Sequence, residues 1–446
     1  MQAMTSIQQT AHQQGNYLVV GLGLTGYSVA NYLLSRGYRV KLQDIREQSD
    51  HVNRLKQAHS ELEFFQQSLD KTLIEWSDIL VVSPGITIRD PLIEQAVADG
   101  KRVIGDIELF AEIVDKPVIA ITGSNGKSTV TTLVGQMITF DQKIAAVGGN
   151  LGTPALDLLH SRNDFYILEL SSYQLETMKS LQPAVATVLN ISEDHLDRYR
   201  DYQDYSDTKM KIYQRAKLCV SNADDAATTY SSADIHFSLT DSRADFTLLD
   251  NQQLVKHGQV WLDVDELKVT GRFNWANCLA SMALADAIGV SKSAIVTALR
   301  AFTGLQHRSQ WVAEIKGVEW INDSKATNPG AAKASIEGRS KPVILLAGGQ
   351  SKDADVSVLK NTLAVHVKQI FLFGEDADKL FENWQSSCVI KRVFDLQQAV
   401  NEAYELAQPG DIVLLAPACA SFDQFQNFSK RGEHFMQLVE ALSSDE

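Results

Sequence analysis

VIAITGSNGKST, residues 118–129, places an apolar run, a glycine-bearing loop and the start of a helical pattern directly after one another. The apolar run 118–121 is typical of a buried strand, Gly123 and Gly126 indicate a tight loop, and the helical pattern continues to Phe140. In such an arrangement backbone N–H groups and the positive end of a helix dipole meet at one place. The stretch therefore predicts a site for the phosphates of a nucleoside triphosphate; the alternative is an ordinary βα turn.

The residues that follow the loop indicate how a phosphate chain would be held. Lys127 is expected to reach the terminal phosphates, and the Ser128 hydroxyl is expected to face the magnesium ion that accompanies them. The usual pattern is G-x-x-x-x-G-K-[ST], but the residue five before Gly126 is Ile121, and the first glycine is Gly123. We therefore interpret the stretch as a shortened phosphate loop.

Length, charge and apolar runs limit the class of protein. A chain of 446 residues is too long for one hydrophobic core and predicts several domains. No uncharged apolar run reaches the roughly 18 residues of a membrane span, and the N-terminal residues lack the apolar core of a signal peptide. A net charge of −14 without a basic stripe argues against nucleic acid as a partner.

The cysteines indicate the compartment. They are scattered and never form a C-x-x-C pair, which argues against a disulfide framework and against a zinc site. We therefore expect a cytoplasmic protein with reduced thiols. The cysteines are Cys219, Cys278, Cys388 and Cys419.

Residues 1–110 are expected to form a Rossmann-like domain. An apolar run at 16–20 leads into GLGLTG, residues 21–26, and then into a helical pattern. Asp44 follows this motif by 18 residues (44 − 26), where a dinucleotide-binding fold places the acid that binds ribose. The same turn also suits another pyrophosphate, such as that of a nucleotide sugar. A further predicted strand brings the loop Ser83-Pro84-Gly85-Ile86 to the same edge of the sheet.

Residues 111–304 are expected to form a central domain with a parallel sheet like that of P-loop ATPases. Glu169 lies at the end of one apolar run, and Asn190 and His195 follow another. Because ligands bind beyond the carboxyl ends of parallel strands, these side chains are expected to converge on the phosphate site. The alternatives are a buried carboxylate satisfied by backbone groups for Glu169, and a packing or surface histidine for His195. Alternation within 246–270 predicts a small antiparallel meander.

Residues 305–446 are expected to form a third, Rossmann-like domain of alternating strands and helices. Polar residues follow its predicted strands, so that Lys325, Lys352 and Ser421 reach one edge of the sheet. Each lysine alone is most simply a solvated surface residue. Together the three side chains predict an anion pocket. The expected fold class is therefore α/β, with three domains.

Eight short motifs resemble the signatures of the Mur ligases and occur in the order found in that family. The resemblance spans residues 21–428. One position departs from the family pattern, because Phe273 precedes Asn274 where the family usually has a histidine. The motifs are TGSNGKST (122–129), GNLGTPAL (149–156), ELSSYQLE (169–176), NISEDHLDRY (190–199), TKMKIY (208–213), GLQHR (304–308), NDSKATN (322–328) and SFDQFQNF (421–428).

The resemblance implies ATP-driven amide bond formation in peptidoglycan precursor synthesis. The carboxylate of UDP-N-acetylmuramoyl-L-alanine would attack the γ-phosphate of ATP to give an acyl phosphate, and the amine of D-glutamate would then displace phosphate. ATP and Mg²⁺ are the implied cofactors, the two small molecules are the implied partners, and a monomer is expected. Such phosphoryl transfer depends mainly on positioning and on charge neutralisation by lysine and magnesium.

The resemblance also implies roles for individual residues of this sequence. Lys127, His195 and Lys209 are implied in catalysis, with Lys209 as a carbamate able to approach magnesium; the alternative is an exposed helix lysine. The residues implied to hold ATP are Gly123, Ser124, Asn125, Gly126, Lys127, Ser128, Thr129, Asn277, Arg308 and Asp323. Those implied to hold magnesium are Ser128, Glu169, His195 and Lys209.

The substrate residues implied by the resemblance fall into two groups. The sugar nucleotide would be held by Leu24, Thr25, Arg46 and Asn150. D-Glutamate would be held by Lys325, Thr327, Lys352, Ser421 and Phe428, because two carboxylates on a small amino acid need fixed donors.

Two other functions stay open on the sequence. A nicotinamide-dependent oxidoreductase would use GLGLTG and Asp44, but it leaves the second glycine loop and the lysines of the third domain without a purpose. A nucleotide-binding regulatory or scaffold protein would show no turnover, or phosphate release independent of D-glutamate.

Overall fold

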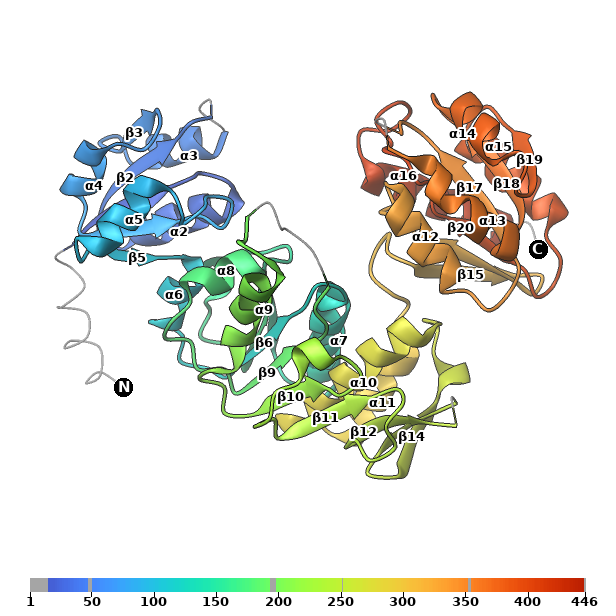
Figure 1. Cartoon of the computed structure of the whole chain (residues 1–446), viewed down its shortest axis with the longest axis horizontal. Helices are drawn as coiled ribbons and strands as arrows, with labels where there is room; N and C mark the ends of the chain where they lie inside the picture. Colours follow the sequence, from blue (N-terminus) through green and yellow to red (C-terminus); the bar gives the residue numbers. More distant parts are fainter. Residues whose placement is uncertain (1–14, 47–49, 193–197, 251, 352–353, 445–446) are drawn as a thin grey trace. The chain divides into compact units, whose positions relative to one another are not determined.

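Figure 1 shows a computed structural model of the chain. It describes residues 15–46, 50–192, 198–250, 252–351 and 354–444. The strands form three sheets, each accompanied by helices, which confirms the expected α/β class with three domains. None of the helices in these ranges is both long enough and apolar enough to cross a membrane.

The first sheet has five parallel strands in the order β3-β2-β1-β4-β5. Its strands are β1 (Asn16–Val20), β2 (Arg39–Asp44), β3 (Glu63–Gln66), β4 (Ile79–Val82) and β5 (Arg102–Ile104), and its helices are α2 (Leu24–Ser35), α3 (Asp50–Ala58), α4 (Lys71–Trp76), α5 (Pro91–Ala98) and α6 (Asp106–Ala111). β1 and β4 are neighbours at the point where the strand order reverses. The loops that follow them therefore leave the sheet at the usual ligand position of an open α/β fold.

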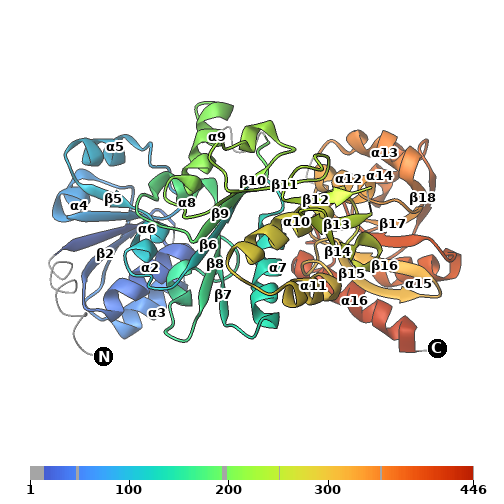
Figure 2. The same cartoon turned by 90° about the horizontal axis from the view of Figure 1, so that it is seen from below.

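Strand β1 explains why this sheet is covered on both faces. Tyr17 and Val19 pack into one apolar core, whereas the alternate residues Leu18 and Val20 pack into another. Helices α2 and α3 lie on one side of the sheet, and α4 and α5 lie on the other (Figure 2). A strand buried on both faces reads as a continuous apolar run, which is how the sequence predicted it.

The second sheet has nine strands in the order β14-β13-β12-β11-β10-β9-β6-β8-β7, and the neighbouring pairs from β12 to β7 are parallel. Its strands are β6 (Val118–Thr122), β7 (Ala145–Gly149), β8 (Phe165–Glu169), β9 (Val185–Val188), β10 (Cys219–Asn222), β11 (Ile235–Ser238), β12 (Phe246–Leu249), β13 (Gln253–Lys256) and β14 (Gln259–Asp263). The helices of this region are α7 (Lys127–Phe140), η1 (Ala155–Leu158), α8 (Ser172–Thr177), α9 (Tyr202–Met210), η2 (Lys211–Tyr213), η3 (Ala226–Thr228), η4 (Val264–Glu266), α10 (Arg272–Ala287) and α11 (Lys292–Ala301).

The predicted meander forms one edge of this second sheet. His257 and Gly258 have φ of +45° and +76°, so they make a two-residue turn with both backbones in the left-handed region. A connection of two residues can join only antiparallel strands, here β13 and β14. The prediction of a meander is confirmed, and the structure adds that β12 continues the parallel sheet through β11.

The third sheet has six strands in the order β15-β16-β20-β17-β18-β19, of which only the pair β15 and β16 is antiparallel. Its strands are β15 (Gln310–Ile315), β16 (Val318–Asn322), β17 (Val343–Gly348), β18 (Val367–Phe373), β19 (Val389–Arg392) and β20 (Ile412–Leu415), and its helices are α12 (Pro329–Glu337), η5 (Val356–Leu359), α13 (Lys360–His366), α14 (Ala377–Trp384), α15 (Leu396–Leu406) and α16 (Phe428–Ser444). Here too successive residues of one strand, Leu345 and Leu346, enter separate cores on the two faces of the sheet.

The chain divides into two compact units. The first consists of Met1–Thr247, Lys256–Gln259 and Leu279–Ile295, and the second of Leu248–Val255, Val260–Cys278 and Val296–Glu446. The first unit contains the first sheet and the phosphate loop. The third sheet, with Lys325, belongs to the second unit.

Candidate active site

The phosphate loop joins β6 to α7. Gly123 has φ of +154° and Gly126, the N-cap of α7, has φ of +82°, so both need the conformational freedom of glycine. No side chain caps α7, because the loop backbone itself leads into its first turn. A Cβ at Gly123 would lie 3.0 Å from the Cβ of Leu189, which shows how closely the loop approaches the end of β9. The first N–H groups of α7 are therefore available to a phosphate group.

Two lysine amines lie at this loop. Lys127 Nζ donates to the carbonyl oxygens of Gly123 and Ser124, each at 2.9 Å. Lys209 Nζ, on α9, donates to the same Gly123 oxygen at 2.9 Å. Lys209 is 2% exposed and its amine lies 4.9 Å from the centre of the Tyr205 ring. The alternative of an exposed helix lysine is therefore wrong for Lys209, which is buried at the candidate site.

Glu169, at the end of β8, is bound by two predicted site residues. Its carboxylate accepts hydrogen bonds from Ser128 Oγ and from Asn150 Nδ2, each at 2.6 Å, and the side chain is 3% exposed. Gly149 makes this approach possible, because its φ is +97° and a Cβ there would lie 2.5 Å from the Glu169 carbonyl oxygen. The structure thus brings Ser128, Asn150 and Glu169 together.

The oxygens of Ser128 and Glu169 are the type of ligand that magnesium prefers. Among the described residues, no group of three or more His, Cys, Asp or Glu side chains is arranged to hold a metal ion. This is compatible with magnesium, which commonly uses one or two carboxylates and completes its shell with phosphate oxygens and water. The donor set of this chain therefore fits such an ion.

Hydrogen bonds from the segment that follows β9 also hold the phosphate loop. Asn190 accepts from the Asn125 N–H at 2.8 Å and donates to the Asn125 carbonyl at 3.1 Å. Ser124 Oγ lies 3.0 Å from the Tyr205 hydroxyl and accepts from the Ser192 N–H at 3.0 Å. Asn190 was predicted from the sequence, but Tyr205 was not. The sequence signal for Tyr205 is its position one helical turn before Lys209 on the same face.

The N-terminal glycine loop uses Asp44 internally. Asp44 accepts from the Leu22 N–H at 2.6 Å and from the Arg46 guanidinium at 2.6 Å. Burial alone would raise the pKa of Asp44, but the hydrogen bonds from Arg46 and Leu22 lower that pKa to about 2. Leu24 and Arg46 are exposed and Thr25 is half-buried at the start of α2, where the cap Gly23 has no side chain to occupy the helix N-terminus. The acid predicted for a ribose is therefore already occupied in holding this loop.

In the second unit, the loop after β16 meets the start of α16. Lys325 Nζ lies 4.1 Å from the centre of the Phe428 ring. Burial, and then the charge of Arg308, lower the pKa of Lys325. Ser421 is 2% exposed, and its hydroxyl has no hydrogen-bond partner in the described part of the chain. Thr327 donates its N–H to the Lys325 carbonyl at 2.7 Å, so the loop is tightly folded.

Three further residues predicted to hold ATP lie in this second unit as well. Asp323 follows β16 and accepts from Ser309 Oγ at 3.4 Å, and burial raises its pKa. Arg308 is exposed, and Asn277 is buried on α10. Two further predicted residues, His195 and Lys352, lie outside the described residues.

One buried arginine that sequence reasoning missed organises this region. Arg431, on α16, is fully buried and donates to the Ser324 hydroxyl and carbonyl at 3.0 Å, to the Gly348 carbonyl at 3.3 Å and to the Cys419 carbonyl at 3.1 Å. Burial lowers the pKa of Arg431 to about 10. It connects the loops after β16, β17 and β20, and no local pattern in the sequence signals these contacts.

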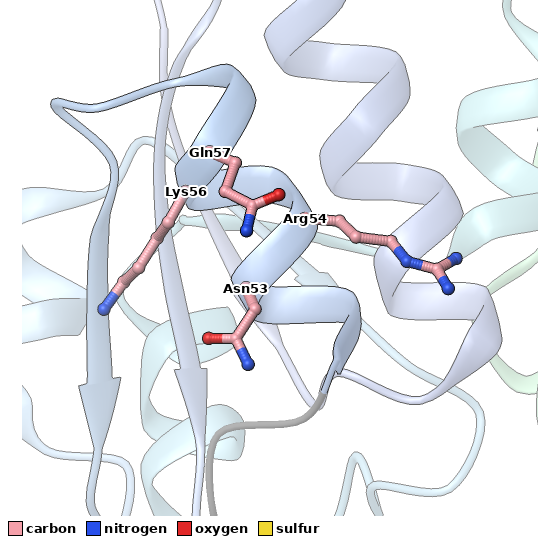
Figure 3. Close-up of a pocket in the computed structure, with 4 residues that line it drawn as sticks. All are labelled: Asn53, Arg54, Lys56 and Gln57. Carbon is pink, nitrogen blue, oxygen red and sulfur yellow. The ribbon is translucent and has the colours of Figure 1, made fainter.

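The hollow beside α3 is a poor candidate for the site. It has a volume of about 560 Å³ and is lined by Asn53, Arg54, Lys56 and Gln57, all from this one helix. Figure 3 shows that Arg54 points away from Lys56, so the side chains do not converge. A binding site needs polar groups that converge from several elements, as they do around Glu169.

Comparison with known proteins shows which family has this combination of domains. Three family models match: "Mur ligase MurD-like, N-terminal domain" at residues 15–105, "Mur ligase middle domain" at 121–285 and "Mur ligase, glutamate ligase domain" at 307–419. A relative from Pseudoalteromonas translucida, named UDP-N-acetylmuramoylalanine–D-glutamate ligase, is 44% identical over 434 residues, which cover 95% of this chain and 96% of the relative. The chain belongs to the Mur ligase family.

Further Mur ligases support this assignment. A protein of the same name from Pseudomonas aeruginosa is 44% identical over 440 residues, which cover 96% of this chain and 98% of the relative. One from Coxiella burnetii is 41% identical over 436 residues, which cover 95% and 98%. The family resemblance expected from the motifs is confirmed. The matched family models are all Mur ligase domains, so the nicotinamide interpretation finds no support in them.

Solved Mur ligase structures share the fold. UDP-N-acetylmuramate-alanine ligase MurC from Thermotoga maritima is 19% identical with a TM-score of 0.57, covering 97% of this chain and 100% of that chain. UDP-N-acetylmuramoyl-L-alanyl-D-glutamate–2,6-diaminopimelate ligase is 19% identical with a TM-score of 0.59, covering 82% and 92%. At this identity the similarity supports the Mur ligase fold and says nothing of the substrate.

Proposed function

We propose that this chain is an ATP-dependent ligase that joins D-glutamate to UDP-N-acetylmuramoyl-L-alanine in peptidoglycan precursor synthesis. The proposal is supported by curated relatives of that name, which are 41–44% identical over 95% or more of the chain. The single structural observation that carries it is the joining of the phosphate loop to Glu169 through Ser128 Oγ at 2.6 Å. This contact supports a role for the Glu169 carboxylate at the phosphate end of the site.

The reaction needs the γ-phosphate of ATP close to the substrate carboxylate. Attack by that carboxylate gives an acyl phosphate and ADP, and attack by the amine of D-glutamate then releases phosphate and forms the amide. The Gly123–Thr129 backbone would orient the phosphates, and Lys127 would neutralise charge on the transferred group. An acyl phosphate must be protected from water, which closure of the domains around it would achieve.

Magnesium would be held by Ser128 and Glu169, with His195 and Lys209 as further candidates. When bound, it would neutralise negative charge on the phosphate oxygens. Lys209 would approach it as a carbamate, formed when its amine adds to carbon dioxide and loses a proton. The burial of Lys209 beside the Gly123 carbonyl supports a role at this site.

The substrates would be held by separate parts of the chain. Leu24, Thr25 and Arg46 would hold the uridine diphosphate at the N-terminus of α2, and Asn150 would contact the muramoyl-alanine end. Asn277, Arg308 and Asp323 would complete the ATP site, and Lys325, Thr327, Lys352, Ser421 and Phe428 would bind D-glutamate. We further propose domain boundaries at residues 1–110, 111–304 and 305–446, a monomeric state and a cytoplasmic location.

Product analysis tests the proposed function. The protein is incubated with ATP, magnesium and UDP-N-acetylmuramoyl-L-alanine, and with a panel of D- and L-amino acids. Product mass and phosphate release are then recorded. We expect product with D-glutamate and phosphate release that depends on it. Phosphate release independent of the amino acid, or product with a different amino acid instead, would contradict the proposal.

A further inference from the structure

Arg198 connects the first sheet to the second within the first unit. Its guanidinium forms a two-pronged pair with the Glu176 carboxylate, with Nε at 3.2 Å and Nη2 at 2.6 Å. It also donates to the carbonyls of Pro84 and Ile86, each at 2.9 Å, and lies 4.1 Å from the centre of the Tyr173 ring. The side chains of Arg198 and Glu176 are only 9% and 4% exposed. None of the predicted site roles uses this arginine.

The first partner of Arg198 is the loop 83–86, which supports the N-terminal glycine loop. Ser83 Oγ donates to the Gly21 carbonyl at 2.6 Å, and a Cβ at Gly21 would lie 2.9 Å from an Ile86 side-chain carbon. The glycine loop in turn leads into α2, where the pyrophosphate of a sugar nucleotide would bind. Any displacement of the loop 83–86 therefore moves that binding site.

The second partner of Arg198 is α8, which is fixed to the end of β8. Ser171 caps α8 and forms a reciprocal pair of hydrogen bonds with Gln174, so the helix start is rigid. Only Leu170 separates this cap from Glu169. Glu176 therefore has a defined position relative to the carboxylate that faces the phosphate loop.

A second arginine also joins these two parts of the first unit. It lies between β4 and α5, whereas Arg198 lies between β9 and α9. Arg89, in the N-terminal part of the chain, donates to the Arg198 carbonyl and to the Asp204 carboxylate, the latter at 2.6 Å. It also lies 5.3 Å from the centre of the Tyr199 ring. The connection is thus built from both sides, which a chance surface contact would not show.

We propose that Arg198 is a positioning residue that holds the loop 83–86 at a fixed distance from β8, and so sets the separation between the sugar-nucleotide site and the phosphate loop. This inference rests on the proposed function. The reacting carboxylate is attached to the sugar nucleotide and the phosphate is attached to the ATP loop. Their separation must be held to within a fraction of an ångström, because misplacement by about 1 Å can cost roughly 10²-fold in rate.

The chemistry of the contacts requires arginine. A planar guanidinium can pair with a carboxylate through two parallel bonds, donate to two carbonyls and stack on a ring at the same time. A lysine ammonium has the same charge but cannot satisfy this set of partners. Arg198→Lys therefore keeps the buried charge while loosening the loop 83–86.

Kinetics of Arg198→Lys test the proposal. We expect kcat to fall about 10- to 100-fold and the KM for UDP-N-acetylmuramoyl-L-alanine to rise, while the KM for ATP stays within about twofold, because Arg198 makes no contact with the phosphate loop in the described residues. Arg200→Lys is the matched control, since Arg200 is two residues away, is 78% exposed and forms its ion pair within the described residues with Asp204. An unchanged KM for the sugar nucleotide, or an equal rise for both substrates, would overturn the proposal.

A second pair of variants covers the case in which Arg198→Lys does not fold. Glu176→Gln keeps a hydrogen-bond acceptor for Arg198, and the double change of Arg198 and Glu176 to Met removes both buried charges, which is commonly tolerated. Each should show the same selective rise in the KM for the sugar nucleotide. Circular dichroism reports folding, and a folded variant with unchanged kinetics would sink the inference.

Direct binding separates this inference from the proposed function. Binding of UDP-N-acetylmuramoyl-L-alanine to the unmodified chain and to Arg198→Lys is measured by titration calorimetry. Weaker binding by the variant supports the positioning role even if neither protein forms product. Absence of product from the unmodified chain counts against the proposed function alone, whereas equal binding by both proteins counts against Arg198.

Discussion

Lys127 and Lys209 donate to one carbonyl oxygen, that of Gly123, although they lie on different helices. Two ammonium groups at one acceptor repel each other, and the repulsion is strongest where water is excluded. A phosphate group beside Lys127, or a negative charge on Lys209, would relieve that repulsion. The lysine pair therefore favours an anionic ligand at this loop.

Removing the Lys127 amine tests the phosphate loop. We expect Lys127→Ala to lower turnover by about 10²- to 10³-fold or more, because charge on the transferred phosphoryl group is no longer neutralised. Circular dichroism should show an intact fold. Lys143→Ala is the control, because Lys143 lies just beyond the other end of the same helix and pairs with Asp141. Retention of most activity by Lys127→Ala would remove the loop from the mechanism.

Chemical rescue tests the carbamate proposed for Lys209. Lys209→Ala should lose activity and regain part of it when acetate or formate is added, because a small carboxylate can occupy the space of the missing carbamate. Lys127→Ala should not be rescued, since it lacks a cation. The measurement is turnover against carboxylate concentration. A complete absence of rescue would argue against the carbamate.

Asp106 predicts a dependence of stability on pH. Burial raises the pKa of Asp106 to about 6, and Gln174 donates to one of its oxygens at 2.9 Å. The folded state therefore holds this proton up to higher pH than the unfolded state, so Asp106 lowers the stability of the wild type as the pH rises from about 4 to about 6. Asp106→Asn should remove the loss, with a gain of up to about 3 kcal/mol above pH 6 that shrinks toward pH 4. Denaturant unfolding at several pH values measures it; a gain that does not change with pH would be inconsistent with this cause.

At the scale of strands and loops, backbone approach decides the geometry around Glu169. Gly149 and Gly152 both have left-handed φ, of +97° and +62°. A Cβ at Gly149 would lie 2.5 Å from the Glu169 carbonyl oxygen, whereas a Cβ at Gly152 would meet nothing within 4 Å. A side chain at either position would be strained by the left-handed backbone, but only a side chain at Gly149 would also clash with Glu169.

This difference makes a matched pair of variants. Gly152→Ala should cost about 1 kcal/mol from backbone strain alone, whereas Gly149→Ala should cost clearly more, about 2–4 kcal/mol. Because β7 would be pushed away from β8, the second variant should also lose ATP-dependent turnover. Denaturant unfolding and steady-state kinetics check both variants. Equal costs at the two positions would mean that the clash with Glu169 is relieved by movement.

The strands also show how much of the fold can be predicted from the sequence. β1 was predicted with the bounds the structure has, residues 16–20, because a strand buried on both faces is a continuous apolar run. The edge strands β3 and β19, EFFQ and VIKR, were not predicted, since each is short and largely uncovered. In the site, Glu169 and Asn190 were found because they follow strands of one sheet. Tyr205 was not found, because its contact with Ser124 spans 81 residues.

At the scale of the molecule, the candidate amino-acid pocket depends on Arg431 for its assembly. The guanidinium binds loops from three different strands through the oxygens of Ser324, Gly348 and Cys419. The buried charge is therefore stabilised by carbonyl and hydroxyl oxygens. Such an arrangement places a positive field beneath the loops that carry Lys325 and Ser421.

Arg431→Met should destabilise the second unit by about 3–5 kcal/mol, because several buried oxygens lose their donor at once. The KM for D-glutamate should rise, since the loops that would bind it are no longer held together. Arg392→Met is the control: Arg392, on β19 of the third sheet, is exposed and pairs with Asp378, so its loss should cost about 0–1 kcal/mol. Thermal unfolding and kinetics measure both, and similar effects of the two changes would contradict the role of Arg431.

The division into two units has a practical consequence. The chain crosses from one unit to the other at 247/248, 255/256, 259/260, 278/279 and 295/296, and every crossing lies inside a strand or helix, in β12, β13, β14, α10 and α11 respectively. A protease needs several residues of accessible, extended backbone to cleave, and hydrogen-bonded strands and helices do not offer them. Limited digestion should therefore cleave exposed loops before it cleaves the chain at any of these five crossings.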